Sequence, residues 1–234
     1  MVTGNNLRQA RVRLGWTQAD VAARLNVSQP YVALWERGLR PLPKALARKA
    51  VRVLRMAPTA LPVRLHFDAA VDPDQFVRQL GALGYPGFAY LRGGRKKNPA
   101  ELLMTGLAQR NLEARLVEAL PWLLLHYPEM DQGWLVDQAR RNNLQNRLGF
   151  VVSLARRTAN ASEHFGDDVR QNLAVLEQKL DRSRLAAEDT LCQASLLPAE
   201  KEWLRVNRPE EAAYWNLLAD WKPEQLQFAA MDPL

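Results

Sequence analysis

Residues 7–38, LRQARVRLGWTQADVAARLNVSQPYVALWERG, contain two short helical patterns separated by a turn, and this stretch decides the fold of the N-terminal part of the chain. Thr17 and Asp20 have the S/T-x-x-D/E spacing of a capping box, in which each side chain bonds the backbone N–H of the other residue. Three apolar residues then recur at helical spacing: Val21, Ala22 and Leu25. We therefore expect a helix to begin at Thr17.

The second helical pattern begins at Ser28 and ends at Gly38. Asn26 tolerates the left-handed backbone that terminates a helix, Ser28 is a favoured N-cap residue, and Pro30 lies in the first turn that follows. Two short helices joined by such a turn form an angled pair. The second helix of such a pair can insert the side chains of its N-terminal end into the major groove of DNA.

Positive charge is concentrated in the same part of the chain. Residues 1–60 contain eleven Lys or Arg against Asp20 and Glu36, a net charge of +9, and because the 234-residue chain carries +7 in total, the remainder carries −2. This uneven distribution is typical of a domain that binds a polyanion. The composition therefore indicates the same partner as the helix pattern, which is double-stranded DNA.

The N-terminal pattern resembles the XRE family of helix-turn-helix regulators, the phage-repressor or Cro/C1 type, over residues 5–56. This resemblance implies a lambda-repressor-like helical DNA-binding head. The positions that carry it are Leu7, Arg8, Arg11, Leu14, Gly15, Thr17, Gln18, Ala22, Leu25, Val27, Ser28, Gln29, Val32, Glu36, Arg37, Gly38, Arg40, Pro41, Leu46, Val53 and Leu54.

The residues expected to read bases lie at the N-terminal end of the second helix of the pair. They are Gln29, Pro30, Ala33 and Leu34. In the family that the chain resembles, the residue at the position of Gln29 often makes paired hydrogen bonds to adenine, which an amide does with one donor and one acceptor. The other three side chains have no donor or acceptor, which departs from the family pattern and suggests contact with thymine methyl groups or recognition of DNA shape.

A second group of residues is expected to bind phosphates and so to fix the register of the domain on DNA. Gln18 lies at a helix N-terminus, where free amides and the helix dipole favour an anion, and the resemblance implies the same role. The full group is Gln18, Tyr31, Arg37, Arg40, Lys44 and Arg8.

Two charged residues of the head are interpreted as structural. Arg11 on the first helix and Glu36 at the end of the third resemble the internal ion pair of the family, which ties the helices together. Because removal of one partner leaves an unmatched charge, Glu36→Ala is expected to unfold the head more than it alters base preference. Val32 and Trp35 are expected to face inward, with Trp16 over the outside of the turn.

The chain is expected to be mainly all-α and to divide into a head of residues 1–56, a linker of residues 57–62 and a larger helical domain of residues 63–234. Proline spacing and the absence of charge favour the linker. In the larger domain, a short strand is expected at 88–91 and a basic loop at 92–99. The loop is interpreted as a solvated turn, with a second phosphate contact as the alternative.

Two apolar patterns of the larger domain have structural interpretations. Val169, Leu173, Leu176 and Leu180 have the spacing of a paired helix, which predicts either a contact between two copies of the chain or a helix packed on its own domain. The aromatic residues between 198 and 221 are interpreted as core rather than as a binding platform.

The sequence contains no recognisable catalytic motif. It has no GxxxxGK[ST] loop, no GxGxxG after a strand and no GxSxG elbow. His66, His126 and His164 lack metal-ligand spacing, and Cys192, the single cysteine, excludes an internal disulfide and a thiolate zinc cluster. We therefore expect no enzyme activity, no metal and no cofactor. With no signal peptide and no apolar stretch of ~18 residues, a cytoplasmic protein without a membrane partner is expected.

These observations predict a transcriptional regulator, with repression as the expected activity, that binds operator DNA as a homodimer because one helix-turn-helix reads only a few base pairs. Residues 120–128 and 134–156 resemble the helical extension of XRE-type regulators that act as antitoxins or control phage-defence operons. The alternative function is therefore an antitoxin-like protein that neutralises a partner protein encoded nearby and autoregulates its own operon. Binding of a small effector by the larger domain is a third interpretation.

Overall fold

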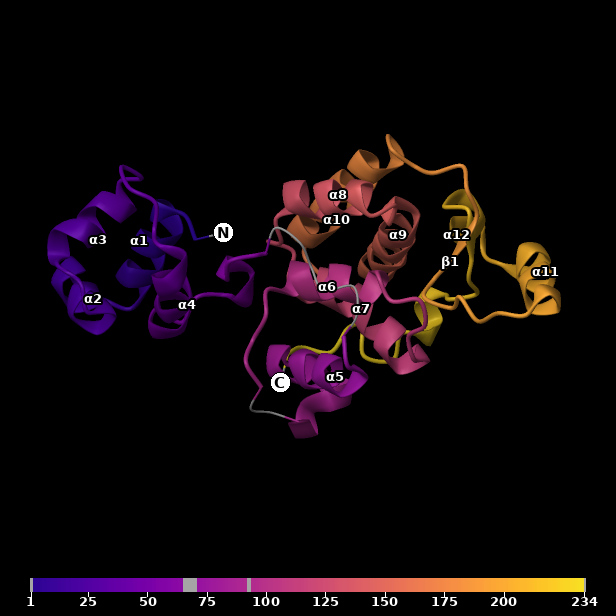
Figure 1. Ribbon diagram of the computed structural model, residues 1–234, viewed down its shortest axis with the longest axis horizontal. Coiled ribbons are helices and arrows are strands. Elements are labelled where there is room, and N and C mark those ends of the chain that lie inside the picture. The colour runs from indigo at the N-terminus through magenta and orange to yellow at the C-terminus, as the bar shows by residue number, and fades with distance from the viewer. Residues whose placement is uncertain (1, 65–70, 92–93, 234) are drawn as a thin grey trace. The chain divides into compact units, whose positions relative to one another are not determined.

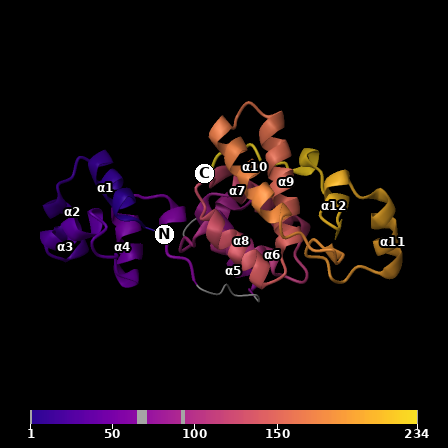
Figure 2. The same cartoon turned by 90° about the horizontal axis from the view of Figure 1, so that it is seen from above.

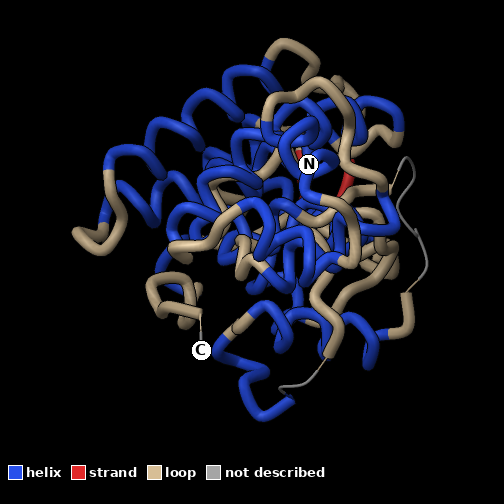
Figure 3. Tube along the Cα trace, turned by 90° about the vertical axis from the view of Figure 1, so that its left-hand side faces the viewer, coloured by secondary structure: helices blue, strands red, loops and turns tan. Residues whose placement is uncertain are grey.

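The computed structural model describes residues 2–64, 71–91 and 94–233 of the chain. The chain forms two compact units, Met1–Arg64 (unit 1) and Leu65–Leu234 (unit 2), which are drawn in Figure 1. Helix predominates in both, and the strands of the described residues are two residues long (Figure 3). The predicted all-α class is confirmed.

No helix among the described residues combines the length and the apolar character that a membrane span requires.

Unit 1 is built from helices α1 Gly4–Arg13, α2 Gln18–Leu25, α3 Gln29–Glu36 and α4 Lys44–Val53, followed by the short 3-10 helix η1 Pro58–Ala60. All four α-helices contribute to one apolar core, which contains Leu7, Ala10, Val21, Ala22, Leu25, Val32, Trp35, Ala50 and Leu54. Val32 and Trp35 are thus buried, as the sequence predicts. This core holds α2 and α3 as an angled pair and leaves the N-terminal end of α3 exposed.

The residues predicted to begin and end the helices of unit 1 lie at those helix ends in the structure. Thr17 is the N-cap of α2: its Oγ1 accepts the N–H of Asp20 at 3.1 Å, and the Asp20 carboxylate accepts the N–H of Thr17 at 2.8 Å. Asn26 ends α2 with a φ of 60°. Ser28 is the N-cap residue of α3, but its side chain makes no capping hydrogen bond. The first amides of α3 therefore have no side-chain acceptor within the described part of the chain.

Residues 57–62, interpreted from the sequence as a linker, belong to unit 1 in the structure. They include η1, and the side chain of Leu61 is 8% exposed. The compact part of unit 1 thus extends to Arg64.

Unit 2 is built around the long helix α9 Gln145–Ala161, which contacts α6 to α8, α10 and α12. Figures 1 and 2 show α9 and α10 side by side. The elements of this unit are α5 Pro73–Leu83, η2 Pro86–Leu91, α6 Pro99–Leu107, α7 Ala114–His126, α8 Gln132–Arg141, α9, α10 Asp167–Asp181, β1 Asp189–Thr190, α11 Pro198–Asn207, α12 Glu210–Tyr214, β2 Leu217–Leu218 and η3 Pro223–Gln225. Strands β1 and β2 pair in parallel.

The strand expected at 88–91 is wrong, because these residues form part of η2. Phe88 is buried there against Tyr85, with 5.4 Å between the ring centroids. The 3-10 turn thus buries Phe88, whereas Tyr90 is 74% exposed. The basic loop expected at 92–99 includes residues 92 and 93, which lie outside the described residues.

The four apolar residues at paired-helix spacing lie on α10 and face the interior of unit 2. Val169, Leu173, Leu176 and Leu180 are between 0% and 8% exposed and belong to the core that includes α9. Of the two interpretations of this pattern, a helix packed on its own domain is correct. These four side chains are buried inside unit 2 and are not available for contact with a second copy of the chain.

The aromatic residues between 198 and 221 divide into buried and exposed groups. Trp215 is fully buried: its ring lies on α9 over Gly149, and its Nε1 donates to Ser153 Oγ at 2.8 Å. Trp203 and Tyr214, by contrast, are 56% and 49% exposed. The prediction of a core role is therefore wrong for Trp203 and Tyr214, because the interior of the unit is already filled by α9 and its neighbours.

A partly buried ion pair ties the two-stranded segment to α9. Arg147 donates to both carboxylate oxygens of Asp189, at 2.6 and 2.9 Å, and also to the carbonyl groups of Leu107 and Gln109 at the end of α6. The guanidinium is thus satisfied on several sides, as a buried cation requires.

Candidate DNA interface

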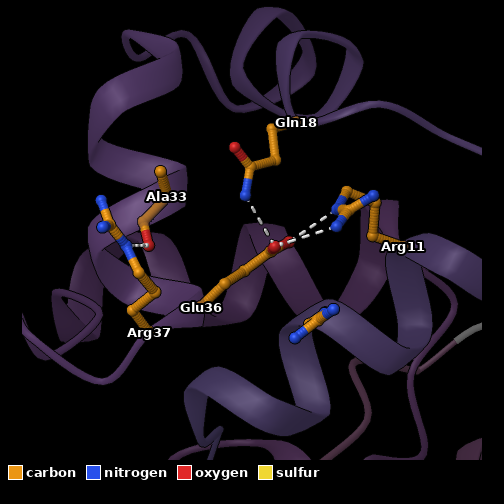
Figure 4. A pocket seen from close by; sticks show the side chains of 6 residues that line it. Arg11, Gln18, Ala33, Glu36 and Arg37 are labelled. Carbon is orange, nitrogen blue, oxygen red and sulfur yellow. Dashed lines mark hydrogen bonds and ion pairs between the residues drawn. The ribbon is translucent and has the colours of Figure 1, made fainter.

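A chain of four polar side chains links all three helices of the head that carry the DNA-binding pattern. Glu36, at the end of α3, pairs with Arg11 of α1 through two hydrogen bonds of 2.6 and 3.0 Å. Gln18 of α2 donates its Nε2–H to Glu36 Oε2 at 2.9 Å, and its Oε1 accepts from Gln29 Nε2 of α3 at 2.7 Å. Arg11 and Gln18 converge on Glu36 in Figure 4.

The Glu36 carboxylate determines which group donates and which accepts in each hydrogen bond between these four side chains. An ionised carboxylate only accepts, so Gln18 must turn its NH₂ group toward Glu36 and its carbonyl oxygen toward Gln29. Gln29 must then donate one N–H to Gln18. Its second N–H and its Oε1 carry no partner among the described residues, so one donor and one acceptor of an exposed amide stay available.

Burial alone would raise the pKa of Glu36, but the hydrogen bonds from Arg11 and Gln18 and the charges of Arg11 and Arg8 hold it below its ordinary value of 4.5. The hydrogen bond to Glu36 raises the pKa of Arg11 in turn. The side chains of Arg11 and Glu36 are only 14% and 3% exposed. The structure therefore contains the internal ion pair that the resemblance implies, and the carboxylate that directs Gln18 is ionised at neutral pH.

A shallow pocket of about 360 Å³ lies between α1, α2 and α3 beside this chain of hydrogen bonds. Six side chains line it: Arg8, Arg11, Gln18, Ala33, Glu36 and Arg37 (Figure 4). Glu36 is neutralised by Arg11, so Arg8 and Arg37 leave the pocket positive. Arg37 donates its Nε–H to Ala33 O at 3.3 Å, which holds its side chain along α3.

The four residues expected to read bases lie along the exposed side of α3. Gln29 and Pro30 are exposed at its N-terminal end, and Ala33 and Leu34 are half-buried one turn further on. Gln29 is thus the only one of the four with a polar group to offer, and the other three present a small apolar surface beside it.

The remaining residues expected to bind phosphate lie on the rim of α3 and on the segment that follows it. The guanidinium of Arg40 lies over the ring of Tyr31, 4.8 Å from its centroid, and both residues are exposed. Lys44 is exposed at the first position of α4. Gln18 differs from the rest, because its polar atoms already bridge Glu36 and Gln29.

The bridge between Gln18 and Gln29 was not predicted from the sequence. The only available signal was that both residues occupy the first position of a helix in an angled pair, and the distance between two helix ends depends on the packing of the core. Trp16, expected over the outside of the turn, is half-buried beneath the guanidinium of Arg24, which lies 3.9 Å from its ring centroid.

In unit 2 the structure brings two histidines together. The rings of His126 and His164 are 6.3 Å apart, His126 Nε2 bonds Ala229 O at 2.9 Å, and His164 Nε2 bonds Asp232 at 3.2 Å. His66 lies outside the described residues. Among the described residues, no group of three or more His, Cys, Asp or Glu is placed to hold a metal ion.

A family model described as Helix-turn-helix matches residues 7–61. Unit 1 is therefore a DNA-binding domain of the helix-turn-helix class. Within that class it is of the XRE type, as the sequence predicts, and the chain is a DNA-binding regulator. Neither a curated protein nor a solved structure matches the chain. The family match ends at residue 61 and so includes no residue of unit 2.

Proposed function

We propose that the protein is a cytoplasmic transcriptional repressor that binds operator DNA as a homodimer through unit 1, and that it acts by binding rather than by catalysis. The observation that carries this proposal is the directed amide of Gln29. Its free N–H and Oε1 are the pair of groups that recognises adenine in the major groove. A side chain held by Gln18 loses less conformational entropy on binding than a free one.

The dimer follows from the size of the reading surface. Helix α3 has eight residues, and of the four expected to read bases only Gln29 offers a polar group to a base edge. Such a surface distinguishes few base pairs, whereas two copies read two half-sites about 34 to 36 Å apart on one side of the duplex. Homodimerisation would therefore supply the specificity that one head lacks.

The proposal is tested by footprinting the full chain on the region upstream of its own gene, with a scrambled fragment of equal composition as control. We expect two protected blocks about one helical turn apart and a steep loss of affinity with salt. Equal affinity for both fragments would refute sequence-specific binding, and a single protected block would refute the dimer. A reporter fused to the same region should be repressed by the wild-type protein and not by Gln29→Ala.

A second candidate function, an antitoxin-like protein that neutralises a partner protein and autoregulates its operon, is favoured by the surface of α11. Ala199, Trp203 and Val206 lie on one side of this helix, and the last two are 56% and 78% exposed. Figure 2 draws α11 at the edge of unit 2. Adjoining exposed apolar side chains of this size are typical of protein interaction sites.

This candidate is tested by co-expression of the full chain with the product of the adjacent gene. Co-purification that is lost in Trp203→Ala, together with relief of growth inhibition by that product, would support the antitoxin function. Growth that is indifferent to the adjacent gene product would refute it. Tyr90→Ala provides a matched control, because Tyr90 is 74% exposed elsewhere on unit 2.

A further inference from the structure

We propose that unit 1 carries a second phosphate-binding surface, on α4, which contacts the DNA backbone outside the segment that α3 reads. This inference rests on the proposed function and adds to it a longer DNA site. The surface, named here the α4 basic face, consists of Lys44, Arg48, Lys49 and Arg52.

The geometry of α4 places these cations along the helix. Ala47, Ala50 and Val51 are buried on its inner side. Lys44, Arg48 and Arg52 follow one another at intervals of four residues, so they form a row with about 6 Å between successive positions. Lys49 lies beside this row. Lys44 and Arg52 are exposed, while Arg48 and Lys49 are half-exposed.

No carboxylate compensates these charges within the described part of unit 1. Its acidic residues are Asp20 and Glu36. The Asp20 carboxylate accepts from the Thr17 N–H and lies 3.9 Å from Arg24, and Glu36 pairs with Arg11. Like charges four residues apart on a helix are destabilising. The stability of the fold therefore does not account for the row of cations.

The N-terminus of α4 points to an anion independently. Its first turn contains no acidic residue, its N-cap is Pro43, and among the described residues no side chain accepts from its free amides. Lys44 occupies the first position, where the positive end of the helix dipole disfavours a cation. A phosphate at this end would accept from the free amides and neutralise Lys44 at the same time.

The arrangement fits a polymer of phosphates better than a single small anion. Duplex DNA carries one negative charge per ~1.7 Å of axis, so a row of cations one helical turn apart can contact successive phosphate groups. The row begins at Lys44, four residues after Arg40, and both are already expected to contact phosphate beside α3. Flanking DNA is therefore the occupant that continues the predicted interface.

The test uses the full chain and a duplex selected by it from a random-sequence library. One probe contains only the base pairs that the selected sequences share, which is the segment read by α3, and a second extends it by ten base pairs on each side. Affinity is measured between 50 and 200 mM KCl for the wild type, for Arg48→Gln/Arg52→Gln and for the control Arg110→Gln/Arg182→Gln. The control removes the same charge from exposed positions of unit 2. Thermal unfolding confirms that each variant is folded.

On the long duplex, the loss of two phosphate contacts should reduce the slope of log K against log salt by about 1.8 in Arg48→Gln/Arg52→Gln. Across the fourfold salt range, the wild type then loses about 12-fold more affinity than this variant. On the short duplex the two should agree, and the control should follow the wild type on both. If the α4 variant and the wild type have equal slopes on the long duplex, the α4 inference is overturned while the proposed function stands. The same conclusion follows if the slope falls equally in the α4 variant and in the control variant. Failure of the chain to enrich any sequence would overturn the proposed function as well.

Discussion

Glu36→Ala separates the structural role of the Arg11–Glu36 pair from a role in base reading. The substitution removes the carboxylate that Arg11 and Gln18 share and leaves the guanidinium without its partner, in a position where the Arg11 side chain is only 14% exposed. We expect unit 1 to lose stability in the full chain while the fold of unit 2 is unaffected.

The expected loss is about 3 kcal/mol. Removal of one partner from a buried pair costs about 3–5 kcal/mol, and the lower end applies because solvent reaches part of Arg11. A domain the size of unit 1 has a total stability of about 3–10 kcal/mol, so the substitution removes a third of it or more. At about 4–8 °C per kcal/mol for a domain of this size, the unfolding midpoint of unit 1 should fall by roughly 12 °C or more.

Hydrogen exchange on the full chain measures the two units separately. Peptides from α1 to α3 should exchange faster in Glu36→Ala, with peptides from α9 as internal reference. Glu202→Ala is the control, because the ion pair of Glu202 with Arg205 is exposed and should contribute about 1 kcal/mol or less. The double variant Arg11→Met/Glu36→Leu should recover most of the loss, since an apolar pair leaves no unmatched charge. Unchanged exchange in α1 to α3 of Glu36→Ala would refute the structural assignment.

Three further predictions concern pH and packing. The folded pKa of Glu36 lies below its ordinary value of 4.5, so this carboxylate should stabilise unit 1 above pH 4.5 and stop doing so as the pH falls below that value. The measurement is an acid titration of unfolding in the wild type and in Arg11→Met/Glu36→Leu. Parallel curves for the two proteins would contradict a stabilising Arg11–Glu36 pair. In a denaturant titration, Gly149→Ala should destabilise unit 2 by about 1–3 kcal/mol, because the new Cβ would lie 2.4 Å from the ring of Trp215. Gly133→Ala is the control. Its new Cβ would have its nearest neighbour at 3.4 Å, so this substitution should be neutral or stabilising. Leu173→Asp should unfold unit 2, as followed by circular dichroism, because it buries a charge; a folded monomer would instead mean that α10 serves contact between copies.

The sequence predicts unit 1 well because its signals are local. The capping box of Thr17 and Asp20 and the left-handed Asn26 depend on neighbouring residues, and the apolar spacing of α2 and α3 leaves one way to bury Val32 and Trp35. The ion pair of Arg11 with Glu36 is long-range, and it was accessible only through the resemblance to a family. The hydrogen bond between Gln18 and Gln29 depends on how two helix ends meet in space, which no spacing rule contains.

Unit 2 was predicted less completely because its contacts are long-range. The spacing of Leu173 and its neighbours suits a helix paired with another chain or with its own domain, and only the position of α9 decides between them. Trp203 and Trp215 have the same residue type and lie twelve positions apart, but one is exposed on α11 and the other covers Gly149. Burial of such residues is set by what the rest of the chain brings near them.

Binding of Gln29→Ala to a set of operator variants tests the account most directly. In this measurement every base pair of the selected site is replaced in turn, and the affinities of wild type, Gln29→Ala and Arg40→Ala are compared at one salt concentration. We expect Gln29→Ala to lose discrimination at one base pair in each half-site, at a cost of about 1–3 kcal/mol, and Arg40→Ala to weaken all sequences alike. A uniform loss in Gln29→Ala, equal to that of Arg40→Ala at every position, would contradict the claim that the directed amide reads a base.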